Sequence, residues 1–233
     1  MGDGGSGTIF FAFCSLHCVF CQNFETSRGR DRYAVSTTEL ADIMLELQER
    51  GCVNINLVTP THYIPQILEA LQAACQKGLK LPLVYNCSGY ERLEILRQLD
   101  GIVDVYLPDI KYADPDIALK YSQISDYPQV AKEAIKEMHK QVGDLVLDEK
   151  GIAKKGLLIR HLVMPGGLAG TASLMKFIAE EISPHAWINI MNQYYPTYLA
   201  HRYPEINRRI TYKEYLEALK AAEQASPDFN LIY

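Results

Sequence analysis

The chain has 233 residues with 48% hydrophobic content, enough to bury the core of one α/β domain or of two small ones. Its 23 Lys and Arg face 28 Asp and Glu, and the resulting net charge of -5 argues against a nucleic-acid surface. The longest apolar stretch near the start, residues 8–13, is too short for a membrane span and follows no basic segment of the signal-peptide kind, so we expect a cytoplasmic protein with no membrane partner.

Apolar runs of strand length alternate with helical patterns along the chain. Two helices are expected to begin at capping boxes, Ser36-x-x-Glu39 and Thr211-x-x-Glu214. In chain order the pattern predicts strand 8–13, helix 40–47, strand 53–58, helix 64–71, strand 81–86, helix 93–99, strand 103–108, helix 131–142, strand 157–163, helix 174–182, strand 186–191 and a last helix from 211 through 219.

This alternation predicts an α/β fold. Six strands that are apolar on both faces and alternate with six helices indicate a parallel sheet covered by helices. Because no glycine-rich dinucleotide motif is present, a partial (β/α)6 TIM-like barrel with outer helices is favoured over a doubly wound sheet. Residues 144–156 carry Lys150-Gly151 between short apolar stretches and predict a hairpin. We expect one domain over residues 1–233, with the glycine-rich residues 1–7 flexible.

Unusual polar residues follow every predicted strand. In barrels of parallel strands, functional sites are built from the loops at the carboxyl ends of the strands, so these segments are expected to share one rim. They are the cysteine cluster of 14–21 after the first strand, and then TPTHY (59–63), NCSGY (86–90), PDIKY (108–112), MPGG (164–167) and NQYYP (192–196).

The cysteine cluster consists of Cys14, Cys18 and Cys21, an odd number of ligands. Three thiolates match three irons of a four-iron cube and leave one iron open to another ligand. The competing interpretation is a structural zinc site, completed by His17 or by a remote cysteine. Six cysteines without paired spacing favour a reducing compartment and metal chemistry over disulfides.

The motif Cys-x3-Cys-x2-Cys, with an aromatic Phe20 before the third cysteine, resembles the radical S-adenosylmethionine (SAM) superfamily. CVFCQN, DIK on the fourth strand and RHLVMPGG on the fifth are similar to the pyruvate formate-lyase activating enzyme branch and its uncharacterised relatives, from about residue 7 to the last helix. The resemblance implies a [4Fe-4S] cluster on Cys14, Cys18 and Cys21 that binds SAM, and an electron that cleaves SAM to a 5'-deoxyadenosyl radical, which abstracts hydrogen from a substrate.

The resemblance also implies the residues that bind SAM. Phe20 is expected beside the adenine, and Asp109 with Lys111 beside the ribose or the methionyl carboxylate, although these two residues also fit a plain ion pair at a strand end. The remaining cofactor contacts that the resemblance implies are Asn86, Ser88, Arg160 and Gln193.

Two features depart from the family pattern. The family usually carries Gly-Gly-Glu after the second strand to bind the methionyl amino group, and this chain has residues 58–62, VTPTH, instead. The hydroxyl of Thr59 and backbone carbonyls are expected to accept the same ammonium protons. We also expect the chain to lack a cysteine-containing segment that relatives carry before the first strand.

Other conspicuous residues have ordinary explanations. Cys52, Cys75 and Cys87 are expected to be small buried hydrophobic residues, and His161 a core histidine with satisfied ring nitrogens. His62 is expected to cap the second helix or to contact substrate, and the tyrosines of 192–204 to line a substrate mouth or to pack across the barrel.

The function that these features predict is a radical SAM enzyme, with a protein glycine as one target and thus a role as a glycyl-radical enzyme activase. Alternative substrates are a small metabolite, a peptide or RNA, and RNA is disfavoured by the charge. An alternative of another class is a zinc or Fe-S binding module without catalysis. Expected partners are a reductant such as flavodoxin or ferredoxin and a glycyl-radical protein.

Overall fold

The computed structural model describes residues 4–233, so residues 1–3 of the segment expected to be flexible lie outside the described residues. Residues 5–7 are hydrogen-bonded to the chain just before the second strand: Val53 N donates to Gly5 O, and Gly7 N donates to Asn54 O, each at 3.0 Å. The ordered backbone therefore begins earlier than the glycine content indicates.

The strands form one curved sheet in the order β1-β2-β3-β4-β6-β7-β8, and every neighbouring pair on this path is parallel. The short β5 pairs antiparallel with β6 and makes the predicted hairpin. The strand bounds are β1 Gly7–Phe10, β2 Ile55–Val58, β3 Leu83–Cys87, β4 Val105–Pro108, β5 Val146–Leu147, β6 Ala153–Leu162, β7 Trp187–Met191 and β8 Asn230–Ile232. The predicted α/β fold with a parallel, partial barrel-like sheet is confirmed, with β8 as an additional edge strand.

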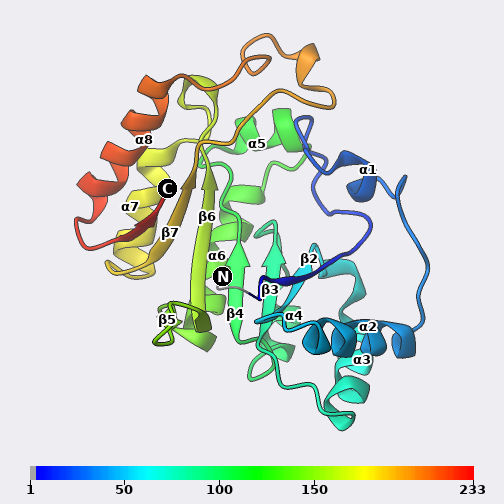
Figure 1. Cartoon of the computed structure of the whole chain (residues 1–233). Helices are drawn as coiled ribbons and strands as arrows, with labels where there is room; N and C mark the ends of the chain where they lie inside the picture. Colours follow the sequence, from blue (N-terminus) through cyan, green and yellow to red (C-terminus); the bar gives the residue numbers. More distant parts are fainter. Residues whose placement is uncertain (1–3) are drawn as a thin grey trace.

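The helices connect successive strands and cover the outside of the sheet (Figure 1). Their bounds are α1 Phe24–Ser27, α2 Thr37–Glu49, α3 Ile64–Gln76, α4 Leu93–Gln98, α5 Pro115–Ser122, α6 Tyr127–Val142, α7 Thr171–Glu181 and α8 Tyr212–Ala225, with short 3-10 turns at η1 Thr61–Tyr63, η2 Pro165–Gly167 and η3 Ala200–Arg202. Both predicted capping boxes are present, at the starts of α2 and α8. Because each box satisfies two otherwise unpaired backbone groups, it fixes where its helix begins.

The two faces of the sheet differ in chemistry. Ile55 and Leu57 point to the outer face of β2 and are buried in one core with apolar residues of α2 and α3. The alternate residues point to the inner face, where Asn56 lines a cavity and Phe10 of β1 is 56% exposed. The prediction of strands that are apolar on both faces holds away from the cavity, because Val84 and Val105 of the inner face are buried in a separate apolar cluster with Leu145, while the carboxyl end of that face borders the cavity.

Several expectations about single residues are also resolved. Cys87 is buried as predicted, but Cys75, in the last turn of α3, is exposed, and Cys52, shortly after α2, is only half-buried. His161 is buried with partners on both ring nitrogens. Among residues 4–233, no helix combines the length and the apolar composition needed to cross a bilayer.

Candidate active site

A cavity of about 450 Å³ is lined by residues at and after the carboxyl ends of the strands, on the inner side of the sheet. The loop after β1 and the loop after β7 both lie at this end of the molecule (Figure 1). All of the residues that the sequence singled out as metal ligands or cofactor contacts line this one cavity, namely Cys14, Cys18, Phe20, Cys21, Thr59, Asn86, Ser88, Asp109, Lys111, Arg160 and Gln193. Residues from six separate segments therefore meet, as the rim argument expects for parallel strands.

The cysteine loop is held against the end of α5. His17 N donates to Ser122 O at 3.1 Å, and Val19 N donates to Tyr121 O at 2.9 Å. On the other side, the backbone N of Leu199, in the loop after β7, donates to Val19 O at 2.8 Å. His17 itself is exposed, so it contributes its backbone rather than its imidazole. These bonds fix the path of a loop that has no regular secondary structure of its own.

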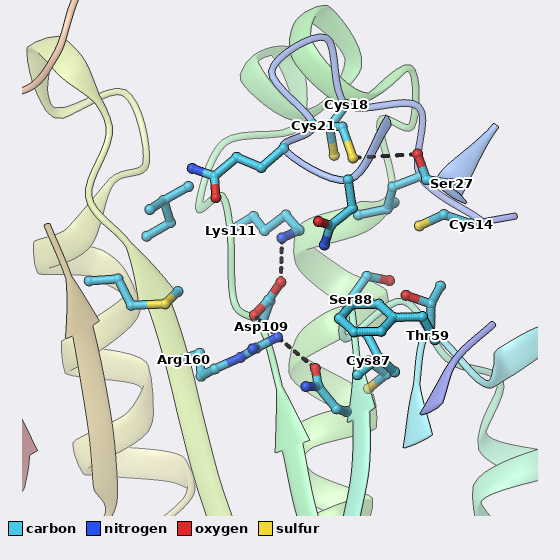
Figure 2. Close-up of a pocket in the computed structure, with 18 of the residues that line it drawn as sticks. Cys14, Cys18, Cys21, Ser27, Thr59, Cys87, Ser88, Asp109, Lys111 and Arg160 are labelled. Carbon is cyan, nitrogen blue, oxygen red and sulfur yellow. Dashed lines mark hydrogen bonds and ion pairs between the residues drawn. The ribbon is translucent and has the colours of Figure 1, made fainter. Parts of the chain in front are cut away.

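The three thiols of the loop face the cavity from different depths. Burial raises the pKa of Cys14 to about 11 and also raises the pKa of Cys18, so neither thiolate forms readily without a positive partner. Figure 2 shows Cys18 and Cys21 above Lys111, and Cys14 below Ser27. Within residues 4–233, no group of three or more His, Cys, Asp or Glu side chains could hold a single metal ion. A four-iron cube takes one thiolate per iron, so three spread thiols suit it better than one zinc ion.

Asp109 lies between two cations at the end of β4. Lys111 Nζ donates to Asp109 Oδ2, and Arg160 Nη2 lies 2.7 Å from Asp109 Oδ1 (Figure 2). Although burial opposes ionisation, Arg160 and Lys111 hold the pKa of Asp109 below its usual value. Arg160 Nη2 also donates to Asn86 Oδ1 at 2.7 Å, so β3, β4 and β6 are joined by one polar chain. The chain carries two positive charges and one negative charge, which suits a ligand with a carboxylate.

Tyr127 links the backbone of two cavity segments, those of Ser88 and of Asp109 with Lys111, from outside the cavity. Its hydroxyl accepts a hydrogen bond from Lys111 N at 3.0 Å. The single hydroxyl proton is shared between two carbonyl oxygens, Ser88 O at 2.8 Å and Asp109 O at 3.1 Å. Tyr127 is fully buried at the start of α6. A Cβ on Gly89, whose φ is +79°, would lie 2.3 Å from Asp109 O, so only glycine permits this close approach of β3 and β4.

The loop after β2 is strained at its cavity residue. Thr59 has φ of +58°, a left-handed conformation that β-branched residues rarely adopt. Its backbone N donates to Asn86 O at 2.8 Å. Two residues later, Thr61 Oγ1 donates to the buried Glu91 at 2.7 Å, and Tyr85 donates to the same carboxyl at 3.0 Å. Burial raises the pKa of Glu91 to about 7. Glu91 thus anchors the loop from the outer side of the sheet, where it does not line the cavity.

His161 fixes the backbone between Asp109 and Lys111. Its Nδ1 lies 2.8 Å from Ile110 O and its Nε2 lies 2.9 Å from Thr171 Oγ1, so it joins the end of β4 to the start of α7. With Nδ1 donating to the carbonyl, Nε2 accepts the threonine proton and the ring is neutral. Burial lowers the pKa of His161 to about 4. The residue is a structural link and not a cavity residue, as predicted.

Phe20 and Gln193 both line the cavity. Phe20 is 5% exposed and packs edge to face on Tyr194, with ring centroids 5.6 Å apart. Gln193 is exposed, and its backbone O accepts from Gln22 Nε2 at 3.2 Å. Their roles toward the adenine and the rest of SAM stay predictions.

Sequence reasoning missed several residues of the site. Thr8, Asn56 and Ser27 line the cavity, and Tyr127 and Glu91 organise it from outside. A polar residue inside an apolar strand run, such as Asn56, was the available signal for the first group. For Tyr127 and Glu91 no local signal exists, because their partners lie in other segments.

Three buried polar atoms of cavity residues have no hydrogen-bond partner among residues 4–233: Arg160 Nε, a donor, and the acceptors Asn56 Oδ1 and Asp109 Oδ1, the last of which is ion-paired with Arg160. Buried groups of this kind are normally satisfied, so their presence in a cavity indicates a polar ligand with both an acceptor and a donor. Together with the three thiols, they fit an iron-sulfur cluster and an amino-acid-like cosubstrate.

Comparisons with known proteins agree with this chemistry. A family model described as the Radical SAM superfamily matches residues 8–166. An uncharacterised protein of Methanocaldococcus jannaschii is 34% identical over 238 residues, which cover 98% of this chain and 64% of that protein. The chain therefore spans less than two thirds of the length of this curated relative.

Solved structures share the fold. Streptococcus suis SuiB, bound to the precursor peptide SuiA, is 14% identical with a TM-score of 0.61, and the match covers 99% of this chain and 49% of SuiB. HydG, a maturase of the [FeFe]-hydrogenase, is 12% identical with a TM-score of 0.62 over 97% of this chain and 50% of HydG. At such identities the likeness concerns the fold alone.

Proposed function

The chain belongs to the radical SAM superfamily, and we propose from this that Cys14, Cys18 and Cys21 hold a [4Fe-4S] cluster and that the neighbouring cavity binds S-adenosylmethionine. Members of this superfamily use both groups. The observation that carries the proposal is that the three cysteines and eight further predicted contacts, from six segments, line a single cavity.

Once bound, the cluster and SAM supply a carbon radical that abstracts a hydrogen atom from a substrate. The residues of the chain bind and orient these groups. Lys111 and Arg160 provide positive charge for a methionyl carboxylate, while Asp109 keeps both cations in place. The Thr59 hydroxyl and nearby carbonyls accept from the methionyl ammonium, in the place of the missing Gly-Gly-Glu. Phe20 gives an apolar surface for the adenine.

The finer part of the proposal is the substrate. The DIK and RHLVMPGG motifs support an activating-enzyme-like oxidoreductase that acts on a glycyl-radical protein. Phe10 on the inner face is 56% exposed, which supports access for a loop of a protein substrate. Flavodoxin or ferredoxin is the proposed reductant. A cytoplasmic location is also part of the proposal, and it is supported by free thiols on all six cysteines.

The ligand assignment is tested by replacing single cysteines and measuring iron and sulfide after anaerobic reconstitution. We expect Cys18→Ala to abolish cluster assembly, because two thiolates do not retain the cube. Cys75→Ala is the control on the exposed side of α3, and Cys87→Ala is a stricter one, since its backbone borders the cavity. Equal loss of iron in Cys18→Ala and in the controls contradicts the assignment.

A further inference from the structure

Two buried hydroxyl groups form a line of hydrogen bonds that ends at the thiol of Cys18. Ser122 Oγ, on the last residue of α5, lies 3.0 Å from Cys18 Sγ, and Tyr112 OH lies 2.8 Å from the same Ser122 oxygen. Ser122 and Tyr112 are both 0% exposed and Cys18 is 8% exposed. Tyr112 follows the DIK segment in sequence, so the line joins the loop after β4 to the cysteine loop through α5.

The direction of these hydrogen bonds depends on the state of Cys18. A free thiol can donate or accept, so either order of the line is possible without a metal. A cysteine that ligates iron is a thiolate and only accepts. Ser122 then has to donate its single proton to Cys18, and the Ser122 oxygen is left to accept from Tyr112. Ligation therefore selects one order, in which Tyr112 donates to Ser122 and Ser122 donates to Cys18.

Alternative partners for these protons are absent from the hydrogen bonds of residues 4–233. Ser122 Oγ bonds only to Cys18 and Tyr112, and the Tyr112 hydroxyl bonds only to Ser122. The situation at Cys21 is different. Ser27 Oγ lies 3.4 Å from Cys21 Sγ, and it also donates to Phe24 O at 3.3 Å in a half-buried position. Ser27 thus has a competing acceptor and a longer contact to its cysteine, whereas Ser122, once it accepts from Tyr112, has Cys18 as the acceptor of its own proton.

We propose that Ser122, oriented by Tyr112, is a positioning residue that donates a hydrogen bond to the Cys18 thiolate and raises the reduction potential of the cluster. The inference rests on the proposed function, because it requires a cluster on Cys18. Reduction adds negative charge to the cluster and its sulfurs, so a donor at the sulfur stabilises the reduced form more than the oxidised form. The effect is strong here because the bond is shielded from water.

The test is a potentiometric titration of the reconstituted cluster, followed by electron paramagnetic resonance of the reduced form, without SAM and without substrate. For Ser122→Ala we expect about a tenfold lower ratio of reduced to oxidised cluster at a fixed potential, which corresponds to about 59 mV for a one-electron couple. Tyr112→Phe keeps the serine but removes the group that orients it, and a smaller shift in the same direction is expected. Ser27→Ala is the matched control, with a shift well below that of Ser122→Ala.

Each outcome bears on the proposal. A Ser122→Ala midpoint equal to that of the wild type or of Ser27→Ala overturns it, as does an upward shift. If Ser122→Ala holds no cluster, Tyr112→Phe decides, and an unchanged potential in that variant overturns the proposal. A wild-type protein that assembles no cluster contradicts the proposed function itself. A wild-type cluster with no shift in either variant contradicts only the role of Ser122.

Discussion

Removal of the Tyr127 hydroxyl is predicted to loosen the cofactor site. In Tyr127→Phe the backbone N of Lys111 loses its acceptor, and the carbonyls of Ser88 and Asp109 lose a shared donor. A buried donor left without a partner costs about 1–3 kcal/mol, and a lost hydrogen bond about 0.5–1.5 kcal/mol. The free energy of unfolding should therefore fall by about 2–4 kcal/mol.

For a domain of this size, 1 kcal/mol lowers Tm by about 2–4 °C, so a loss near 3 kcal/mol lowers Tm by roughly 6–12 °C. Because the segments of Ser88 and of Asp109 with Lys111 both border the cavity, we also expect Kd for SAM to rise by at least about tenfold, equivalent to about 1.4 kcal/mol. The assays are thermal unfolding of the metal-free protein and equilibrium binding of SAM to the reconstituted protein.

The matched control is Tyr90→Phe. Tyr90 stacks on Tyr127 with ring centroids 6.3 Å apart, but its hydroxyl bonds to Asp126 at an exposed position. Surface changes of this kind cost within about 0.5 kcal/mol, so Tm should move by no more than about 2 °C. Equal Tm values and equal SAM affinities for Tyr127→Phe and Tyr90→Phe would refute the role given to Tyr127.

Three further outcomes are expected. Thr59→Gly removes left-handed strain of about 1–3 kcal/mol against a glycine entropy cost of about 0.5–1 kcal/mol, so the free energy of unfolding should rise by about 1 kcal/mol while SAM binds more weakly. Gln123→Gly, also at a left-handed position but outside the cavity, should leave the affinity for SAM unchanged. Tighter SAM binding by Thr59→Gly would argue against the Thr59 hydroxyl as a SAM contact. For pH, burial raises the pKa of Glu91 from 4.5 to about 7, so its contribution to stability is complete below pH 4.5 and is lost as pH rises through 7. The pKa of His161 is lowered from 6.5 to about 4, so its contribution is complete above pH 6.5 and is lost on acidification toward pH 4, and the two groups offset each other between these limits. Glu91→Gln should therefore lose about 3 kcal/mol more stability than the wild type between pH 7 and 4.5 in urea unfolding, and parallel pH profiles would disprove the assignment.

The fold was predictable because its strands and helices carry strong local signals. The capping boxes at Ser36 and Thr211 placed the starts of two helices, and the apolar runs placed six strands. The strand β8 was missed because its three residues form a strand only by pairing with β7. The helix α5 was missed although Asp114 caps it and Pro115 begins it, because the side chains that it buries, Ala118, Tyr121 and Ser122, give only a weak apolar periodicity.

The lining of the candidate site was largely predictable, since polar segments at the ends of parallel strands have to meet. The residues that hold this lining in place from outside the cavity were not predictable. Tyr127, Glu91 and Ser122 act through partners 6 to 104 positions away in the chain, and neither their type nor their neighbours mark them. The exposure of Cys75 was mispredicted because its burial was inferred from residue type, whereas Cys75 lies beside the buried face of α3 and not on it.

Cleavage of SAM by the reconstituted protein tests the central claim most directly. The protein is loaded with iron and sulfide without oxygen, mixed with SAM and a strong chemical reductant, and assayed for 5'-deoxyadenosine. The account predicts about four irons and four sulfides for each chain and formation of 5'-deoxyadenosine that depends on the reductant and is absent in Cys18→Ala. A protein that takes up zinc alone and releases no 5'-deoxyadenosine would contradict it.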